Sequence, residues 1–271
     1  MFWLVSLFLG AGPKIPPKET FIWVFVAFVS ILIHELGHAV LIRRFGWSPR
    51  VTLYGLGGLA SYETRQGYRG SYSSSYSSYD EPEPSAMRQI LISLAGPGAG
   101  FLFAALTVGA IYLFGGSVHF FFGGVRGVDW LVTGFSNPML VTLWYFLIYI
   151  NLFWGLINLL PIYPLDGGRV SRELFLMQGS PSIQIERSLM LSLIVAAAFA
   201  LYAAVALGSF LTTLMFGYFA VMNYQAIQAL RGRGGWQTGN GGGNYGGDDY
   251  GGGYRGNYDD DDDYSGRGGG R

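Results

Sequence analysis

The sequence predicts an α-helical polytopic membrane protein of about five transmembrane helices, with a small membrane-associated β element and a disordered C-terminal tail. Of the 271 residues, 51% are hydrophobic and 13% are charged, whereas a soluble globular domain carries about 25% charged residues. Five stretches are apolar over the length that a spanning helix needs, which is roughly 20 residues. The chain after Leu230 contains almost no aliphatic residues, so it cannot bury enough apolar surface to fold.

The expected spanning helices follow one another in the apolar body of the chain. They cover residues 20–42, 87–114, 139–160, 188–207 and 210–230. Because only Leu207, Gly208 and Ser209 link the last two stretches, we expect these two helices to form a tight antiparallel hairpin. The segment 1–19 begins with an apolar run that is too short to span, so we expect it to lie at the membrane interface.

The basic residues are distributed unevenly between the two sides of the expected membrane protein. If all five helices span, 14 of the 17 Lys and Arg residues lie in the first and third connections and in the tail. Loops rich in Lys and Arg stay in the cytoplasm. We therefore expect these segments to be cytoplasmic and the membrane to be the cell membrane. The net charge of zero favours no nucleic-acid partner.

The connections outside the apolar stretches have distinct compositions. Residues 49–62 are short, Gly-rich and partly alternating, which predicts a small sheet. An insertion at 63–86 follows, and its part from 67 to 84 has the Ser, Tyr and Gly content of a linker. The tail at 231–271 is rich in Gly, Asp, Tyr and Arg. We expect this tail to be a solvating segment or a docking segment for an unidentified partner.

Two histidines and a glutamate in the first apolar stretch form a pattern typical of a metal site. The run His34-Glu35-Leu36-Gly37-His38 places two imidazoles at i and i+4 on one helix face, with a carboxylate beside the first. Imidazole binds zinc, and the carboxylate can take a proton from water at the metal. These residues could also be polar helix residues without a special role. However, ionisable groups inside a span cost roughly 2.5–3.5 kcal/mol each and normally mark function.

A hydrolytic zinc site needs a third protein ligand. The chain contains no cysteine, so this ligand is a histidine or a carboxylate. His119 and Asp129 lie on the opposite expected side of the membrane, whereas Asp166 follows the third apolar stretch on the same side as the histidine pair. Helix order therefore favours Asp166. Glu173 and Glu186 are alternatives if their loop folds back, and Asp166 alone could simply start a turn.

The pairing of HELGH at residues 34–38 with N-x-x-P-x-x-P-L-D-G at residues 158–167 resembles the site-2 protease family of intramembrane metalloproteases. A weaker likeness is the A-G-P-G-A-G run at 95–100, which helix packing explains equally well. The resemblance implies zinc ligands at His34, His38 and Asp166, a catalytic base at Glu35 and a substrate-positioning amide at Asn158.

The resemblance also implies a division of the chain and an activity. Residues 20–169 form the protease core, residues 170–230 form a C-terminal transmembrane hairpin, and residues 231–271 are not covered. The implied activity is that of a zinc metalloendopeptidase that cuts membrane-spanning protein substrates within or near the bilayer, in regulated intramembrane proteolysis. An unwound substrate could pair with the small sheet. The alternative is a non-catalytic membrane scaffold with a structural metal site.

Overall fold

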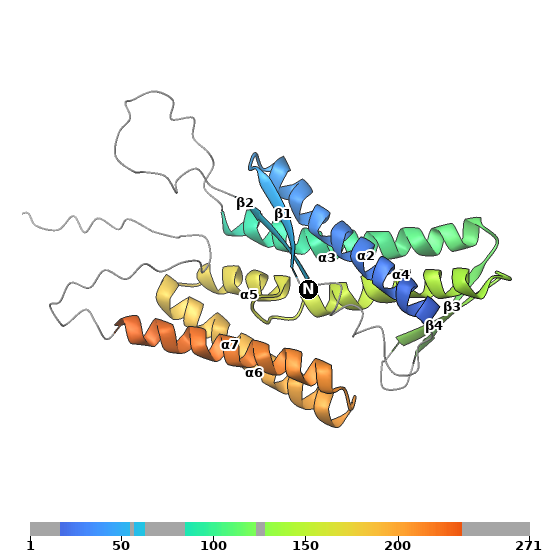
Figure 1. Ribbon diagram of the computed structural model, residues 1–271. Helices are drawn as coiled ribbons and strands as arrows, with labels where there is room; N and C mark the ends of the chain where they lie inside the picture. The colour runs from blue at the N-terminus through green and yellow to red at the C-terminus, as the bar shows by residue number, and fades with distance from the viewer. Residues whose placement is uncertain (1–16, 55–56, 63–84, 123–127, 235–271) are drawn as a thin grey trace, which may run out of the picture.

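The computed structural model describes residues 17–54, 57–62, 85–122 and 128–234, and Figure 1 shows these as long helices with two small hairpins. In chain order the elements are α2 (Pro17–Arg44), β1 (Pro49–Tyr54), β2 (Gly57–Tyr62), α3 (Ala86–Leu113), β3 (Ser117–Phe122), β4 (Val128–Thr133), α4 (Pro138–Asn158), α5 (Asp166–Leu176), α6 (Pro181–Val205) and α7 (Phe210–Gly234). The predicted linker lies outside the described residues. Residues 1–16 of the predicted interfacial segment and residues 235–271 of the predicted tail also lie outside them. Residues 17–19 instead begin α2, and residues 231–234, predicted to be disordered, form the last turn of α7.

Four helices of the described part are long and apolar enough to cross a membrane, namely α2, α3, α4 and α6. They correspond to the first four predicted stretches, although α6 begins earlier than predicted, at Pro181. The fifth stretch forms α7, which is 25 residues long and continues past the predicted end at Leu230. α7 is not among the four helices that are long and apolar enough to span, so its crossing of the membrane stays a prediction.

Small residues allow α2 and α3 to approach closely. A Cβ added at Gly37 of α2 would overlap the backbone carbonyl of Ala95 and would lie 2.7 Å from the Cβ of Ala99, both in α3. Contacts between small residues are a common way to hold helices together in lipid, where burial of apolar surface gives little drive. The second half of α2 therefore packs directly on the first half of α3.

The predicted small sheet is present beside α2 (Figure 1). Its two strands pair antiparallel, from Pro49 opposite Tyr62 to Tyr54 opposite Gly57.

Two elements occur where the sequence predicted only loops. The connection between α3 and α4 contains the antiparallel pair β3–β4, whose Trp130 and Val132 pack with Ile111 and Ile148 of the flanking helices. The connection after α4 contains the 11-residue helix α5. Both elements are too short to give the long apolar signal of a span. In addition, two glycines in the first turn of α5 lower its helix propensity.

The predicted hairpin of α6 and α7 is confirmed. Gly208 in the link has a φ of +58°, a left-handed conformation that glycine adopts at little cost. At the other end of the hairpin, the Arg231 guanidinium lies 2.6 Å from the Glu186 carboxylate. Phe216 of α7 packs with Ile162, which precedes α5. The hairpin therefore lies against the segment that leads into α5.

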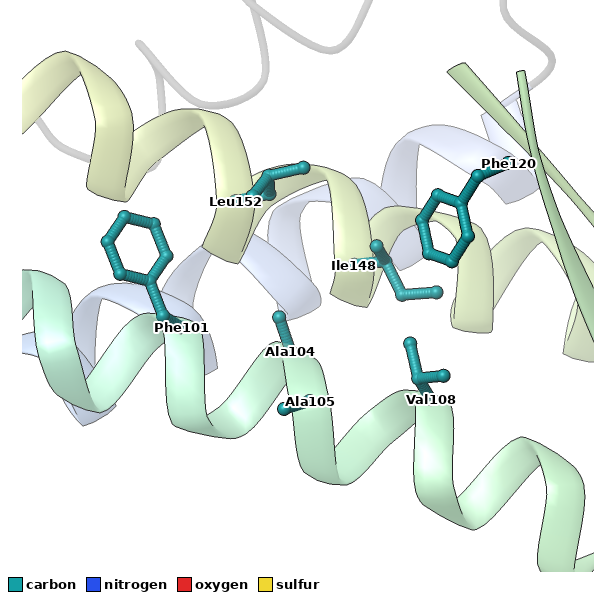
Figure 2. A pocket seen from close by; sticks show the side chains of 7 residues that line it. All are labelled: Phe101, Ala104, Ala105, Val108, Phe120, Ile148 and Leu152. Atoms are coloured by element: carbon teal, nitrogen blue, oxygen red, sulfur yellow. The ribbon is translucent and has the colours of Figure 1, made fainter. Parts of the chain in front are cut away.

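An apolar cavity of about 270 Å³ lies between α3 and α4. Figure 2 shows Phe101 and Val108 of α3 facing Ile148 and Leu152 of α4 across it. All of its lining side chains are apolar. This cavity offers no titratable or metal-binding group, so it is not a site for chemistry.

Candidate active site

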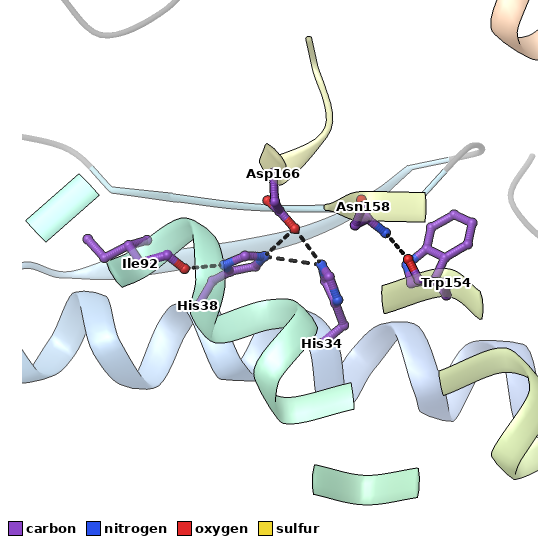
Figure 3. A network of polar contacts seen from close by, with 6 residues as sticks. All are labelled: His34, His38, Ile92, Trp154, Asn158 and Asp166. Atoms are coloured by element: carbon purple, nitrogen blue, oxygen red, sulfur yellow. Dashed lines mark hydrogen bonds and ion pairs between the residues drawn. The ribbon is translucent and has the colours of Figure 1, made fainter. Parts of the chain in front are cut away.

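Three polar side chains of α2 are buried among apolar helices. His34, Glu35 and His38 are 4%, 5% and 6% exposed. Residues four apart share a helix face, and Figure 3 shows both imidazoles pointing away from α2 toward the same carboxylate. Buried ionisable groups inside a spanning helix are costly and mark a functional site.

The carboxylate is that of Asp166, the first residue of α5. Its Oδ2 lies 3.0 Å from Nε2 of His34 and 3.4 Å from Nε2 of His38. The two Nε2 atoms are 3.2 Å apart. The fold therefore closes a triangle of three ligand atoms (Figure 3), although Asp166 follows His34 by 132 positions in the chain.

This triangle fits a zinc ion. Ligand atoms at about 2.0–2.2 Å from zinc and at tetrahedral angles lie about 3.3–3.5 Å from one another. The observed edges are 3.0, 3.2 and 3.4 Å. Two imidazoles and one carboxylate are a suitable donor set, and three protein ligands leave the open fourth position of a catalytic zinc site.

His38 is oriented by the backbone of α3. Its Nδ1 donates a hydrogen bond to the carbonyl oxygen of Ile92 at 2.7 Å. Because a carbonyl only accepts, Nδ1 carries a proton; in the neutral ring, the form that binds a metal, the lone pair is then on Nε2, which faces the triangle. Histidine ligands of metals are commonly held by a second contact of this kind.

A break in the helices brings Asp166 to the histidines. α4 ends at Asn158 and α5 begins at Asp166. Between them, Pro161 and Pro164 lack the backbone N–H that a continuous helix needs. The chain therefore turns and starts a new helix with the carboxylate at its first position.

Two glycines allow the turn to pack against the start of α5. A Cβ added at Gly167 would overlap the backbone of Leu159, and one at Gly168 would overlap the backbone of Ile162. Only glycine permits contacts this close, so the Gly-Gly pair fixes how Asp166 leaves the turn.

The charge of Asp166 suits a metal ligand. Burial raises the pKa of its carboxyl, but the hydrogen bonds and charges of His34 and His38 outweigh burial and hold that pKa well below its usual range. The carboxyl is therefore ionised at neutral pH, which is the form that binds a metal.

Glu35 lies beside the triangle. One of its carboxylate oxygens is within 4.8 Å of a ring nitrogen of both His34 and His38. As the next residue after His34 it points about 100° away around the helix axis. Asp166 approaches from another helix and contacts both Nε2 atoms, so Asp166 rather than Glu35 completes the triangle.

Asn158 is placed at the end of α4, next to the break that carries Asp166. It is buried, and its amide nitrogen donates to the backbone oxygen of Trp154 at 2.9 Å (Figure 3). The structure thus sets this amide at the border of the site. Its role toward a substrate stays a prediction.

The other candidate ligands lie elsewhere. His119 and Asp129 belong to β3 and β4, beyond the far end of α3. Glu173 is buried in α5 two helical turns after Asp166, and Glu186 pairs with the end of α7. None of these four residues enters the triangle.

Gly96 of α3 touches both histidines, a contact that the sequence did not predict. A Cβ there would overlap Nε2 and Cε1 of His38 and would lie 2.8 Å from Nε2 of His34. The absence of a side chain lets α3 lie against the ligand atoms. The A-G-P run was the available signal, and it resembled the family's small-residue element as well as it fitted helix packing.

One of the comparisons with known proteins, the family match, covers all the residues of this site. The profile of peptidase family M50 matches residues 21–202. The Rip3 protein of Mycobacterium tuberculosis is 30% identical over 173 residues, which are 64% of this chain and 32% of that protein. The zinc metalloprotease MJ0392 of Methanocaldococcus jannaschii is 29% identical over 148 residues, which are 54% of this chain and 32% of that protein. The chain therefore spans about a third of the length of these curated relatives.

A solved structure has the same fold. The site-2 protease from Methanocaldococcus jannaschii superposes with a TM-score of 0.52 and 19% sequence identity, over 83% of this chain and 86% of that one. At this level of identity the likeness concerns the fold alone.

Proposed function

The chain belongs to peptidase family M50, the site-2 protease family, and from this membership we propose that it is an intramembrane zinc metalloprotease. It hydrolyses peptide bonds of membrane-spanning proteins within or near the bilayer, in regulated intramembrane proteolysis. The observation that carries the proposal is the buried triangle of His34, His38 and Asp166. This triangle has the spacing of a zinc site and is built on a helix able to span the membrane.

The depth of the site supports a substrate that lies in the membrane. His34 is ten residues from the end of the candidate span Lys18–Arg44, which is about 15 Å of helix. The hydrocarbon core of a bilayer is about 30 Å thick. A site at this depth reaches peptide bonds inside a spanning segment.

Each residue has its own role in the proposed reaction. His34, His38 and Asp166 would hold the zinc ion, which when bound would supply Lewis acidity toward the scissile carbonyl and the attacking water. A carboxylate oxygen of Glu35 accepts the proton of the attacking water and passes it to the nitrogen of the leaving peptide. The amide of Asn158 positions the peptide.

The small sheet beside α2 suits an unwound substrate. A helical segment must open before attack, because its carbonyls are engaged in internal hydrogen bonds. Among the described residues, β1 and β2 pair only with each other, so each has a second edge. We propose that the opened substrate adds to this sheet as a further strand.

The orientation follows from the basic residues. We propose that Arg43 and Arg44 at the end of α2, the α5 region and the tail face the cytoplasm of the cell. The ion pair between Arg231 and Glu186 supports a tail on the α5 side, because it joins the end of α7 to the beginning of α6. The active site then opens toward the cytoplasm.

Glu35→Gln separates metal binding from hydrolysis. We expect the purified variant to retain about one zinc per chain, as three ligands remain. Quantitative mass spectrometry of membranes from cells that carry the native protein or the variant should show client proteins uncut in the variant. His34→Ala should lose both zinc and cleavage.

Three outcomes would contradict this proposal. Cleavage by Glu35→Gln at the native rate would exclude Glu35 as the base. Full zinc content in His34→Ala would refute the ligand set. Identical membrane proteomes in native and variant cells, with zinc bound in both proteins, would support the scaffold alternative.

A further inference from the structure

Tyr163 precedes Asp166 by three residues, in the turn between α4 and α5. Its backbone N–H donates to Oγ of Ser192 in α6 at 3.1 Å. Its carbonyl oxygen accepts from Nδ2 of Asn223 in α7 at 2.7 Å. An unpaired backbone group away from water is costly, so the two helices of the hairpin together hold the backbone of Tyr163 in place.

Burial and further hydrogen bonds fix the two side chains in this arrangement. Ser192 is 1% exposed, and its hydroxyl donates to the oxygen of Ser188 at 3.0 Å, which leaves Oγ to accept from Tyr163. Asn223 is 0% exposed, and its Nδ2 also donates to the oxygen of Phe219 at 2.8 Å. Both partners of Nδ2 are carbonyl oxygens, so the orientation of the amide is determined.

Apolar packing strengthens the contact between the turn and the hairpin. Ile162 is fully buried and forms a cluster with Leu165, with Ala196 of α6 and with Phe216 of α7. The N–H of Leu165 donates to the oxygen of Ile162 at 2.8 Å, which closes a turn around Tyr163. The turn is therefore one compact unit held against α6 and α7.

The turn also fixes the position of the first residues of α5. A Cβ added at Gly168 would overlap the backbone of Ile162 and of Tyr163, so the turn touches the first turn of α5 with no side chain between them. A shift of the turn is therefore passed directly to Asp166, whose Oδ2 lies 3.0 Å from His34.

We infer that Ser192 and Asn223 are positioning residues for Asp166. Through the backbone of Tyr163, the α6–α7 hairpin holds the third zinc ligand at the distance that the metal requires. This inference rests on the proposed zinc site. It goes beyond the family likeness, because Asn223 lies outside the matched residues 21–202.

Ser192→Ala tests the contact from α6. This variant removes the acceptor for the N–H of Tyr163. Ser188→Ala is its matched control, because Ser188 lies one turn away on the same helix, is 3% exposed and donates to Ile185 within α6. Both changes delete one buried serine hydroxyl, and only the first removes a bond to the turn.

Asn223→Leu tests the contact from α7. It removes the donor to Tyr163 with little change in volume. Thr213→Val is its control, because Thr213 lies in the first turn of the same helix and its hydroxyl donates to the carbonyl oxygen of Ser209, the residue before that helix.

The readout is metal binding by the purified full-length protein. Each variant is stripped with a chelator and titrated with Co²⁺, whose visible d–d bands report the ligand geometry. We expect Ser192→Ala and Asn223→Leu to lower Co²⁺ affinity by about tenfold or more, the range known for residues that orient metal ligands. We also expect both variants to shift the d–d bands and both controls to match the native protein.

Native affinity and native bands in Ser192→Ala and in folded Asn223→Leu would overturn the inference, even if their melting temperatures fell. If Asn223→Leu does not fold, the Co²⁺ affinity and d–d bands of Ser192→Ala alone test the inference. A native protein that binds no Co²⁺ would instead contradict the zinc site itself, and this inference with it.

Discussion

Gly96→Ala places a methyl group where His38 Nε2 and Cε1 lie, and 2.8 Å from Nε2 of His34. We expect zinc affinity to fall by about tenfold or more, as for other changes that displace metal ligands. Zinc titration of the stripped protein measures this. Gly98→Ala is the matched control, because a Cβ added there meets no atom within 4 Å. Equal affinity of the two variants would contradict the contact between α3 and the ligands.

Glu173→Gln should change how stability depends on pH. Burial raises the pKa of Glu173 above its ordinary value of 4.5, although the charge of Arg172 lowers it. The folded protein therefore holds this proton more tightly than the unfolded chain. The resulting stability is present below pH 4.5 and is lost as the pH rises through the folded pKa.

The variant cannot ionise at this position, so its melting temperature should exceed that of the native protein at about pH 7 and match it at about pH 4. Glu186→Gln is the control, because Glu186 forms an exposed ion pair with Arg231. Such pairs contribute about 0–1 kcal/mol. A melting-temperature difference that is the same at both pH values would argue against a raised pKa of Glu173.

The sequence predicted the side chains that the structure brings together. The pair of His34 and His38 could be recognised because its spacing is local. To assign Asp166 as the third ligand, helix order and the family resemblance were needed, because Asp166 is far from the two histidines in the chain. The A-G-P run drew attention to the region of Gly96, but the contacts of Gly96 and Asn223 could not be predicted, because they depend on how α3 and α7 are rotated against their neighbours.

Among the elements, the packing of α2 on α3 predicts a cost for enlarging Gly37. Gly37→Ala would push its Cβ into the carbonyl of Ala95. We expect a loss of about 1–3 kcal/mol of stability, as for other overpacked sites, measured as a lower melting temperature in detergent. Gly109→Ala, in an open position of α3, should be neutral or stabilising by up to about 1 kcal/mol. A native melting temperature in Gly37→Ala would contradict the close approach.

The long helices could be predicted as elements because a span leaves an apolar run of characteristic length. The sheet β1–β2 left a short alternating pattern and was also predicted. The pair β3–β4 and the helix α5 were missed, because each is short and depends on packing against longer helices. Pro161 and Gly167 correctly predicted that the helix ends there. Because proline and glycine disfavour helix, they did not predict that a new helix begins at Asp166.

For the whole molecule, the proposed orientation predicts which positions a membrane-impermeant maleimide reaches in intact cells. The native chain has no cysteine, so single-cysteine variants give a clean signal. Ser136→Cys, before α4, should be labelled from outside. Ser180→Cys and Ser265→Cys should be labelled only after the membrane is opened, because both are expected in the cytoplasm. Labelling of Ser265→Cys in intact cells would show that α7 does not return the tail to the cytoplasm.

X-ray absorption spectroscopy of the purified protein can show whether His34, His38 and Asp166 together hold one zinc ion. We predict about one zinc per chain, with two imidazoles and a carboxylate oxygen at about 2.0–2.2 Å, and loss of the metal in Asp166→Ala. A zinc shell without two imidazoles, or an unchanged shell in Asp166→Ala, would refute this ligand set.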